Sequence, residues 1–291
     1  MTDLESLKSG KTERDENFPV ASFLIAARFR QPILDFYRFA RAADDVADHP
    51  RLPQREKFAA LDLLEATLLG KTDAAGDALP LRAALAATGH PPRHALDLLT
   101  AFRMDVTKRR YCDWGELLNY CSYSAMPVGR FVLDVHGQAQ STWRASDALC
   151  AALQVINHLQ DCAKDFRALD RVYIPLDALA AHGIGVDAFA MDRASPQLRA
   201  CLRSLAAKVG EFLPDATKLP HQVTSLRLGA ETAAIVGLAQ KLLGFLSRRD
   251  PLSERVHLTK AGTLAVVARA ASWAIAGRVL GQIWPDAAAR G

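Results

Sequence analysis

The sequence has few cysteines and little excess charge of either sign. Its 291 residues include five cysteines, and no two of them form a Cys-x-x-Cys pair. An odd, scattered set of this kind argues against a disulfide framework and against a structural zinc site. The formal net charge is only +4, which is too small for a protein that binds nucleic acid through its overall field. We therefore expect no nucleic-acid partner.

Long uninterrupted hydrophobic runs are also missing. The most apolar stretch, residues 261–284, is rich in alanine and contains Arg269 and Arg278, charges that a membrane-spanning helix usually lacks. The N-terminal residues alternate charged and polar positions and have no apolar core of the kind that a signal peptide needs. We expect a cytoplasmic protein in which residues 1–16 form a loose tail and residues 261–284 form a core helix.

Glycine-rich nucleotide motifs are absent as well. The fragments SGKT at 9–12 and GKT at 70–72 look like phosphate loops, but Glu5 and Glu65 stand where a Walker motif requires its first glycine. No dinucleotide fingerprint is visible, so we predict no NADPH requirement. One Glu-x-x-His element, at 254–257, is not enough for a di-iron bundle, which needs two.

Helix-forming patterns fill most of the chain. Alanine, leucine and arginine recur at spacings of three and four, whereas alternating β-branched runs are sparse. The pattern predicts one all-α domain over residues 1–291. The predicted helices cover residues 18–28, 32–48, 51–69, 79–88, 92–108, 114–136, 146–166, 175–181, 196–213, 223–246 and 260–284.

Residues 37–48, YRFARAADDVAD, place three aspartates close together within a helical pattern. At 3.6 residues per turn, Tyr37, Arg41, Asp44 and Asp48 fall on one stripe, and phenylalanines and alanines flank it. A stripe that faced solvent would be flanked by Lys, Glu or Gln instead. We infer that the carboxylates point into a partly enclosed space, where unpaired charge is costly.

A second stripe of the same kind occurs much later in the chain. Asn157, Asp161 and Asp165 follow one another at spacings of four within LQVINHLQDCAKDF, again among apolar neighbours. Two such helices facing each other would suit Mg²⁺, which takes one or two protein carboxylates together with water and substrate phosphates. The alternative is that each stripe is a solvated helix face, paired with Arg41 or Arg171. Two matched stripes with apolar flanks favour the metal site.

Three motifs in this order resemble those of the squalene/phytoene synthase family of head-to-head prenyl transferases. They are YxFxRxxDDxxD, then YCxYxAxxVG, then NxxxDxxxD followed by RVYIP. The resemblance implies an all-α, isoprenoid-synthase-type helical bundle around a central apolar cavity. The Mg²⁺ ligands that it implies are Asp44, Asp48, Asn157, Asp161 and Asp165. The diphosphate-binding residues that it implies are Ser22, Tyr37, Arg41, Asn157 and Arg171, and the catalytic residues are Asp44, Asp48, Asp161, Asp165 and Tyr120.

Other segments point to one branch of that family. ENFPVASFLI at 16–25, YSAMPVGRFVLDVHG at 123–137 and NHLQD at 157–161 resemble the bacterial hopanoid-pathway enzymes that make hydroxysqualene from presqualene diphosphate. Gln160 departs from the family pattern, because many members have an arginine there. Met126 and Pro127 depart from it too, because small residues are usual at those positions. We expect Gln160 to remove a phosphate-binding charge and Pro127 to distort its helix.

The reaction implied by the resemblance is Mg²⁺-dependent ionisation of presqualene diphosphate, followed by capture of the rearranged carbocation by water. One alternative is a presqualene diphosphate, squalene or phytoene synthase that condenses two prenyl diphosphates. Another is a non-catalytic lipid-binding or assembly protein on the same fold, and the intact acids of both motifs argue against it. Peripheral contact with the inner membrane and association with other hopanoid-pathway enzymes are further expectations.

Four aromatic residues near the motifs have competing interpretations. Tyr120 and Tyr123 either contact the cation or the diphosphate, or pack in the core with satisfied hydroxyl groups. His136 and His158 are candidates for positioning water. A lone histidine on a helix is more often hydrogen-bonded locally, so we expect both to be structural.

Overall fold

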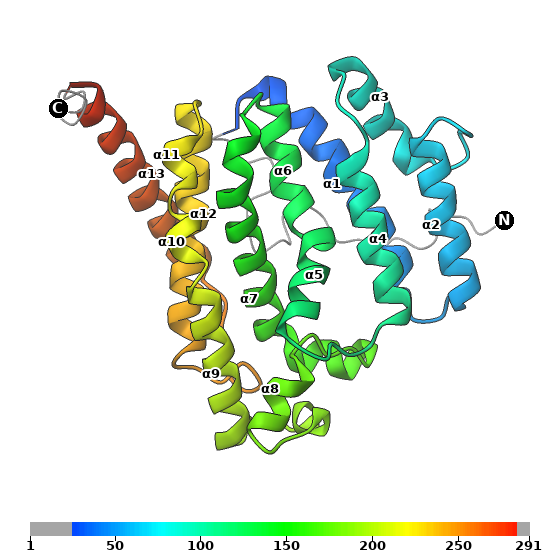
Figure 1. The fold of residues 1–291 in the computed structure, drawn as a ribbon, viewed down its shortest axis with the longest axis vertical. Helices are drawn as coiled ribbons and strands as arrows, with labels where there is room; N and C mark the ends of the chain where they lie inside the picture. Colours follow the sequence, from blue (N-terminus) through cyan, green and yellow to red (C-terminus); the bar gives the residue numbers. More distant parts are fainter. Residues whose placement is uncertain (1–24, 284–291) are drawn as a thin grey trace.

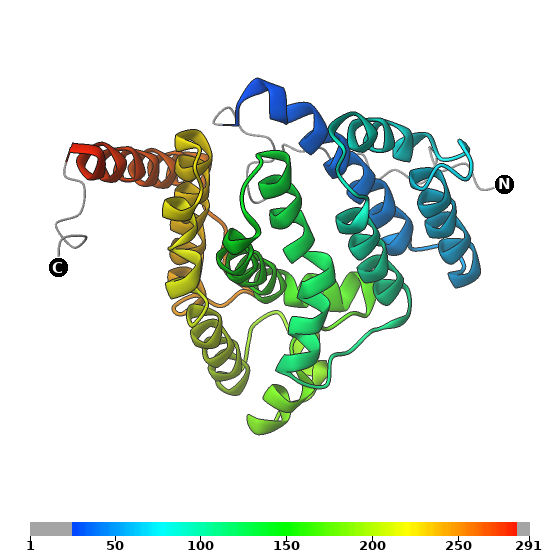
Figure 2. The same ribbon diagram turned by 45° about the horizontal axis from the view of Figure 1, so that its top comes forward.

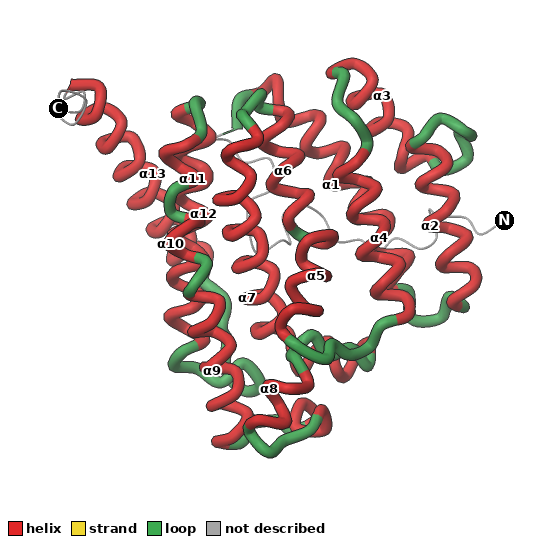
Figure 3. Tube along the Cα trace, viewed as in Figure 1, coloured by secondary structure: helices red, strands yellow, loops and turns green. Residues whose placement is uncertain are grey.

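The computed structural model describes residues 25–283, and these residues form helices and no β-strand (Figures 1 and 3). The predicted all-α class is therefore confirmed. The α-helices are α1 Ala27–Asp48, α2 Gln54–Leu68, α3 Leu79–Thr88, α4 Arg93–Thr107, α5 Trp114–Ser124, α6 Met126–Val135, α7 Trp143–Leu169, α8 Leu176–Ala181, α9 Pro196–Gly210, α10 Leu213–Ala216, α11 Leu219–Gln222, α12 Leu226–Leu246 and α13 Lys260–Ile283. Short 3₁₀ turns are η2 Gly76–Ala78, η3 Gln140–Thr142 and η4 Val186–Ala190.

The 27-residue helix α7 runs through the middle of the molecule (Figure 1). It packs against α5 and α6 on one side and against α9, α10 and α12 on the other. Helices α1 to α4 form a second group, which reaches α7 through α6, because α6 contacts α1, α4 and α7. The helices that carry the two acidic stripes, α1 and α7, therefore both pack against α6.

Two hydrophobic cores meet at α6. One lies among α1 to α4 and includes the buried side chains of Phe36 and Leu64. The larger one surrounds α7 and includes Ile156. Phe131 of α6 belongs to the first core and Leu133 to the second. Because a helix turns about 100° per residue, the two side chains leave α6 in different directions and tie the two cores together.

The helix predicted over residues 114–136 is divided at Ala125, whose backbone (φ −123°, ψ −46°) is not helical. Pro127 follows in the first turn of α6, where its missing N–H leaves no helical hydrogen bond unmade. The predicted single helix is therefore two helices, and the irregularity expected from Pro127 lies two residues before it, at Ala125. Gly129 then lets α6 approach α7 closely, because a Cβ atom there would lie only 2.6 Å from Cys150 Sγ.

The predicted break between residues 28 and 32 is wrong. Helix α1 is continuous from Ala27, with Pro32 inside it. Pro32 lies only slightly beyond the first turn, whose N–H groups have no helical partners anyway, so a single backbone hydrogen bond is lost. The remainder of the predicted helix over 18–28 and the predicted tail over 1–16 fall outside the described residues.

Helix α13 is not the core helix that the sequence predicted. Its described residues pack against α12, and in both views the helix projects away from the body of the molecule (Figures 1 and 2). Leu264 on α13 is 66% exposed. The alanine-rich pattern predicted the helix correctly but says nothing about what covers it. Among the described residues, no helix has the length and apolar character needed to cross a membrane.

Candidate active site

The first acidic stripe lies on α1 as the spacing predicted. Tyr37, Arg41, Asp44 and Asp48 are all partly exposed, whereas most of the apolar side chains between them are buried, namely Phe39, Ala43, Val46 and Ala47. Arg41 holds the stripe together, because its guanidinium lies 3.0 Å from an Asp44 oxygen and 2.9 Å from an Asp45 oxygen. The stripe is thus a partly buried row of polar side chains flanked by apolar ones, rather than a solvated helix face.

Burial and charge repulsion both disfavour the ionised form of Asp44 in this stripe. Burial against the surrounding protein, and then the neighbouring charge of Asp48, raise the pKa of Asp44 to about 7. Asp105 on α4 raises it further, so α4 brings a third acid within electrostatic range of the stripe. A bound cation would stabilise the ionised form of such a carboxyl group and lower its pKa again.

The second acidic stripe lies on α7, again with the predicted spacing. Asn157, Asp161 and Asp165 are partly exposed between buried apolar residues. Burial, and then the charge of Asp161, raise the pKa of Asp165 to about 7. Asp48 of α1 contributes to the same rise, so the structure brings the two stripes within electrostatic range of each other.

Arg171, just beyond the end of α7, reaches the first stripe on α1. Its Nη1 donates to Asp48 Oδ1 at 3.0 Å, and its Nη2 donates to the backbone carbonyl of Asp105 at 2.9 Å. The residue is only 4% exposed. Burial lowers the pKa of Arg171, but Tyr173, then Asp105 and Asp48, more than offset it and raise the pKa, which keeps the guanidinium charged.

A buried network behind Arg171 was missed from the sequence. Tyr120 donates a hydrogen bond to Asp105 Oδ2 at 2.7 Å, and Tyr173 donates to Asp105 Oδ1 at 2.8 Å. Arg171 Nη1 also donates to the Tyr173 hydroxyl at 3.1 Å. Burial raises the pKa of Asp105 to about 6 even though these three donors oppose the shift. The only signals in the sequence were an acid among apolar residues in FRMDV and the tyrosine in RVYIP.

Tyr120 and His158 are both buried beside this network. Burial, then the charge of Asp105, raise the pKa of Tyr120 well above its ordinary value, so the phenol stays protonated. His158 stacks on the Tyr173 ring with centroids 3.7 Å apart, and burial lowers its pKa to about 3. His136 Nδ1 donates to the Val132 carbonyl at 2.7 Å, and the ring packs against Phe29. The structural reading of the two histidines fits these contacts.

Lys57 is a further cation near the acids that sequence reasoning did not single out. It lies on α2, and its Nζ donates to the carbonyl of Ala47 at 2.7 Å, one residue before Asp48. Burial lowers the pKa of Lys57, while Asp48 opposes that shift. Arg109 and Arg171 lower it as well, so three positive groups gather around the Asp48 end of the site.

Gln160 points away from the acids. The side chain is 6% exposed, and its Nε2 donates to the backbone carbonyl of Val256 at 2.8 Å. It therefore ties α7 to the segment between α12 and α13. The expected loss of a phosphate-binding charge at this position stays a prediction, and Ser22 lies outside the described residues.

The donor set fits Mg²⁺ shared with a phosphate substrate. Among the described residues, no three Cys, His, Asp or Glu side chains are close enough to enclose a metal by themselves. Mg²⁺ usually takes only one or two protein carboxylates and completes its shell with water and phosphate oxygens. Pairs of mutually repelling carboxylates on two facing helices match that requirement, as the raised pKa values of Asp44 and Asp165 indicate.

Comparison with known proteins places this arrangement in a class. Residues 11–262 match the squalene/phytoene synthase family, and the chain belongs to that family. It is 56% identical over 258 residues to a hydroxysqualene synthase of Rhodopseudomonas palustris, covering 89% of this chain and 88% of the relative. It is 46% identical to a hydroxysqualene synthase of Zymomonas mobilis, covering 92% and 91% of the two chains.

Solved structures of squalene and dehydrosqualene synthases have a similar fold. A squalene synthase of Alicyclobacillus acidocaldarius superposes with a TM-score of 0.72 at 29% identity, covering 84% of this chain and 92% of that one. A dehydrosqualene synthase superposes with a TM-score of 0.78, covering 93% and 95%, and at 20% identity this likeness bears on the fold alone. The predicted family and the isoprenoid-synthase-type helical fold are therefore confirmed.

Proposed function

We propose that the protein is a hydroxysqualene synthase, which ionises presqualene diphosphate and adds water to the rearranged carbocation. The identity to hydroxysqualene synthases over about nine-tenths of the chain supports this choice. The observation that carries the chemistry is the pair of carboxylate stripes within electrostatic range of each other, with Arg171 bound to Asp48 beside them. A site of this charge pattern suits an enzyme acting on a diphosphate ester.

In this proposal Asp44, Asp48, Asn157, Asp161 and Asp165 hold Mg²⁺. When bound, Mg²⁺ neutralises charge on the departing diphosphate and so makes it a better leaving group. Arg41 and Arg171 offer planar guanidinium groups to the phosphate oxygens. Tyr37 and Ser22 are the proposed hydroxyl donors to the same diphosphate.

Tyr120 is proposed to act from the wall of the site. Its raised pKa means that the phenol keeps its proton at neutral pH and remains a hydrogen-bond donor. Asp105 accepts that hydrogen bond, which fixes the ring. The ring would then present its face to the carbocation, an arrangement that the aromatic quadrupole favours.

Two further parts of the proposal concern the surroundings of the reaction. An apolar cavity between the helices would fold the prenyl chains and limit the access of water to the cation. The chain would work in the cytoplasm without NADPH, in peripheral contact with the inner membrane and with other hopanoid-pathway enzymes. A head-to-head condensation of two prenyl diphosphates is the alternative, because phytoene synthases such as that of Mycobacterium tuberculosis are 29% identical over 79% of the chain.

The deciding experiment separates these reactions by substrate. Purified protein and Mg²⁺ are incubated with presqualene diphosphate or with farnesyl diphosphate, without NADPH, in water labelled with oxygen-18. We expect a labelled C30 alcohol from presqualene diphosphate, and none from an Asp48→Ala or Asp161→Ala variant. A C30 diphosphate formed from farnesyl diphosphate would assign the protein to the condensation step instead. No turnover of either substrate would favour a non-catalytic role.

A further inference from the structure

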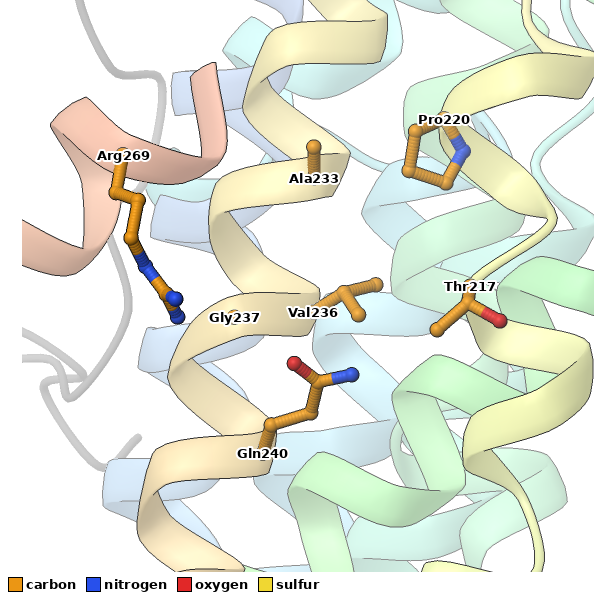
Figure 4. A pocket seen from close by; sticks show the side chains of 7 residues that line it. All are labelled: Thr217, Pro220, Ala233, Val236, Gly237, Gln240 and Arg269. Atoms are coloured by element: carbon orange, nitrogen blue, oxygen red, sulfur yellow. The ribbon is translucent and has the colours of Figure 1, made fainter. Parts of the chain in front are cut away.

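A pocket of about 460 Å³ lies outside the acidic site, beside α12 and α13 (Figure 4). Four residues of α12 line it, namely Ala233, Val236, Gly237 and Gln240. Their spacing of three, one and three places them on one face of that helix. No residue of either acidic stripe lines the pocket, so it is a separate site.

The rest of the lining comes from three other helices or turns. Pro220 of α11 and Thr217, just after α10, close one side. Arg269 of α13 extends its guanidinium toward the Gly237 turn of α12 from the other side (Figure 4). The pocket thus combines an apolar wall, a single cation and two neutral polar groups. Its size suits a hydrocarbon chain, since small-molecule pockets span roughly 300–1,000 Å³.

The helix that supplies Arg269 carries cations and no acids. From Arg255 to Pro285 the sequence contains no aspartate or glutamate, and its Lys and Arg residues are Arg255, Lys260, Arg269 and Arg278. Leu264 on the same helix is 66% exposed. A projecting helix with exposed apolar surface and only positive charge is suited to the surface of an anionic bilayer.

We propose that the pocket and α13 together bind an anionic phospholipid at a bilayer surface. One acyl chain fills the apolar pocket, and Arg269 lies over the lipid phosphate. A phosphodiester has one negative charge, which a single guanidinium can match, whereas a free prenyl diphosphate would call for several cations or a metal. Lys260 on the same helix extends the contact to neighbouring headgroups. The proposal does not depend on which reaction the acidic site performs.

Vesicle binding tests the electrostatic part. The purified full chain is mixed with phosphatidylcholine vesicles that contain or lack phosphatidylglycerol, and the bound fraction is measured by flotation. We expect binding only with phosphatidylglycerol, weakened by salt. Arg269→Gln should lower the partition coefficient about fivefold, because one such charge contributes about 1 kcal/mol near an anionic surface. Arg203→Gln on α9, an exposed arginine outside the pocket, is the matched control and should change little.

Photocrosslinking tests the pocket itself. Vesicles containing phosphatidylglycerol with a photoreactive acyl chain should label residues 233–240, and Arg269→Gln should reduce that label. Equal binding to both kinds of vesicle, an unchanged partition coefficient for Arg269→Gln, or labels confined to other helices would overturn the proposal. So would displacement of the label by soluble farnesyl diphosphate at concentrations that leave vesicle binding intact. A dimer that Leu264→Glu dissociates, seen by light scattering, would assign the surface to a second copy of the chain.

Discussion

Arg171 Nη1 lies 3.0 Å from Asp48 Oδ1 and joins two residues that are 123 positions apart in the chain. Asp48 is the last residue of α1, and Arg171 follows the end of α7. The same guanidinium donates to the Asp105 carbonyl on α4. One side chain at the end of α7 therefore holds the end of α1 and a third helix, α4, together.

Loss of this guanidinium should harm both stability and activity. Arg171→Gln leaves the buried carboxylate of Asp105 and the facing Asp48 without their common counter-ion, and we expect the free energy of unfolding to fall by about 3 kcal/mol. Turnover, measured as kcat/KM with presqualene diphosphate, should fall about 100-fold. Arg171→Lys keeps the positive charge but not the planar group with several N–H donors. It should therefore be more stable than Arg171→Gln and less stable than the wild type.

Arg103 provides the matched control for Arg171. It also lies between two acids, Asp62 and Glu65, each at 2.6 Å, but on a more exposed surface. Arg103→Gln should cost less than about 1 kcal/mol in urea unfolding and leave turnover intact. Equal losses for the two arginines would show that Arg171 is an ordinary surface ion pair.

Tyr120 and Tyr173 form a natural comparison, because both donate to Asp105. Each Tyr→Phe substitution removes one hydrogen bond to a buried carboxylate and should lower the free energy of unfolding by about 2 kcal/mol. If Tyr120 faces the carbocation, the kcat of Tyr120→Phe should be at least about tenfold lower than that of Tyr173→Phe. The reason is that the Tyr120 ring, without its hydroxyl, is no longer held in the orientation that the reaction needs. Equal kcat values for the two variants would reduce Tyr120 to a structural residue.

Replacing Gln160 by arginine should not create a phosphate-binding site. Gln160 is buried and donates to the Val256 carbonyl, so Gln160→Arg would bury a charge without a carboxylate partner and lower the free energy of unfolding by about 3 kcal/mol. Gln160→Leu, which loses one neutral hydrogen bond, should cost only about 1 kcal/mol. A lower KM for presqualene diphosphate in Gln160→Arg would mean that position 160 faces the diphosphate after all.

The acidic stripes could be predicted from sequence because helix periodicity is local. Asp44 and Asp48, like Asp161 and Asp165, fall on one face by spacing alone, and the apolar residues around them already indicated an enclosed site. Asp105 could not be predicted, because its importance comes from Tyr120 and other partners distant in the chain. An isolated acid on a helix has no local signal that separates a buried acceptor from a surface charge.

The errors in the predicted fold have the same origin. Pro32 was taken as a helix start, yet the cost of a proline depends on how far into the helix it falls, which requires the position of Ala27. The last helix was predicted correctly over 260–283, but its exposure depends on which other helices cover it. Periodicity identifies the face of a helix, and tertiary packing decides what meets that face.

Mg²⁺ and inorganic diphosphate should stabilise the protein more together than the sum of their separate effects. The facing carboxylates need a cation, and Mg²⁺ needs phosphate oxygens to complete its shell. At about 100 times the dissociation constant the pair should add about 2.7 kcal/mol, seen as a higher unfolding midpoint in a thermal shift experiment. Chelation with EDTA should abolish this gain and the enzymatic activity.

Substitutions in the two stripes test whether the joint stabilisation by Mg²⁺ and diphosphate arises at these acids. Asp44→Asn and Asp161→Asn should each lose the joint stabilisation by Mg²⁺ and diphosphate. Without ligands, Asp44→Asn should be no less stable than the wild type, because it removes a carboxylate that burial and Asp48 disfavour. Asp187→Asn, which changes an exposed acid on η4, should respond like the wild type. Full stabilisation by diphosphate alone would argue against metal ligation by the stripes.

The contribution of three histidines to the free energy of unfolding should fall as the pH drops below about 6.5, the ordinary pKa of histidine. Burial lowers the pKa of His94, His136 and His158 in the folded protein. The unfolded chain takes up a proton at each of these positions at a higher pH than the folded chain, so their stabilising contribution is complete above about pH 6.5 and is lost below it, by at most about 1.4 kcal/mol per pH unit for each group. The raised pKa values of Asp44, Asp105 and Asp165 act in the opposite direction, so the histidine contribution is measured by comparing a histidine variant with the wild type.

His94 is the histidine best suited to test this loss. It belongs to neither acidic stripe, and its hydrogen-bond partner Asp134 is not a stripe residue either. Its Nε2 lies 2.9 Å from Asp134 Oδ2, which together with Asp97 opposes the lowered pKa, while Arg93 supports it. His94→Gln keeps a polar group beside Asp134 but cannot take up a proton. In urea unfolding about one pH unit above and below 6.5, this variant should lose less stability on acidification than the wild type. An identical loss in both proteins would show that His94 titrates normally, as it would if the imidazolium were fully stabilised by Asp134.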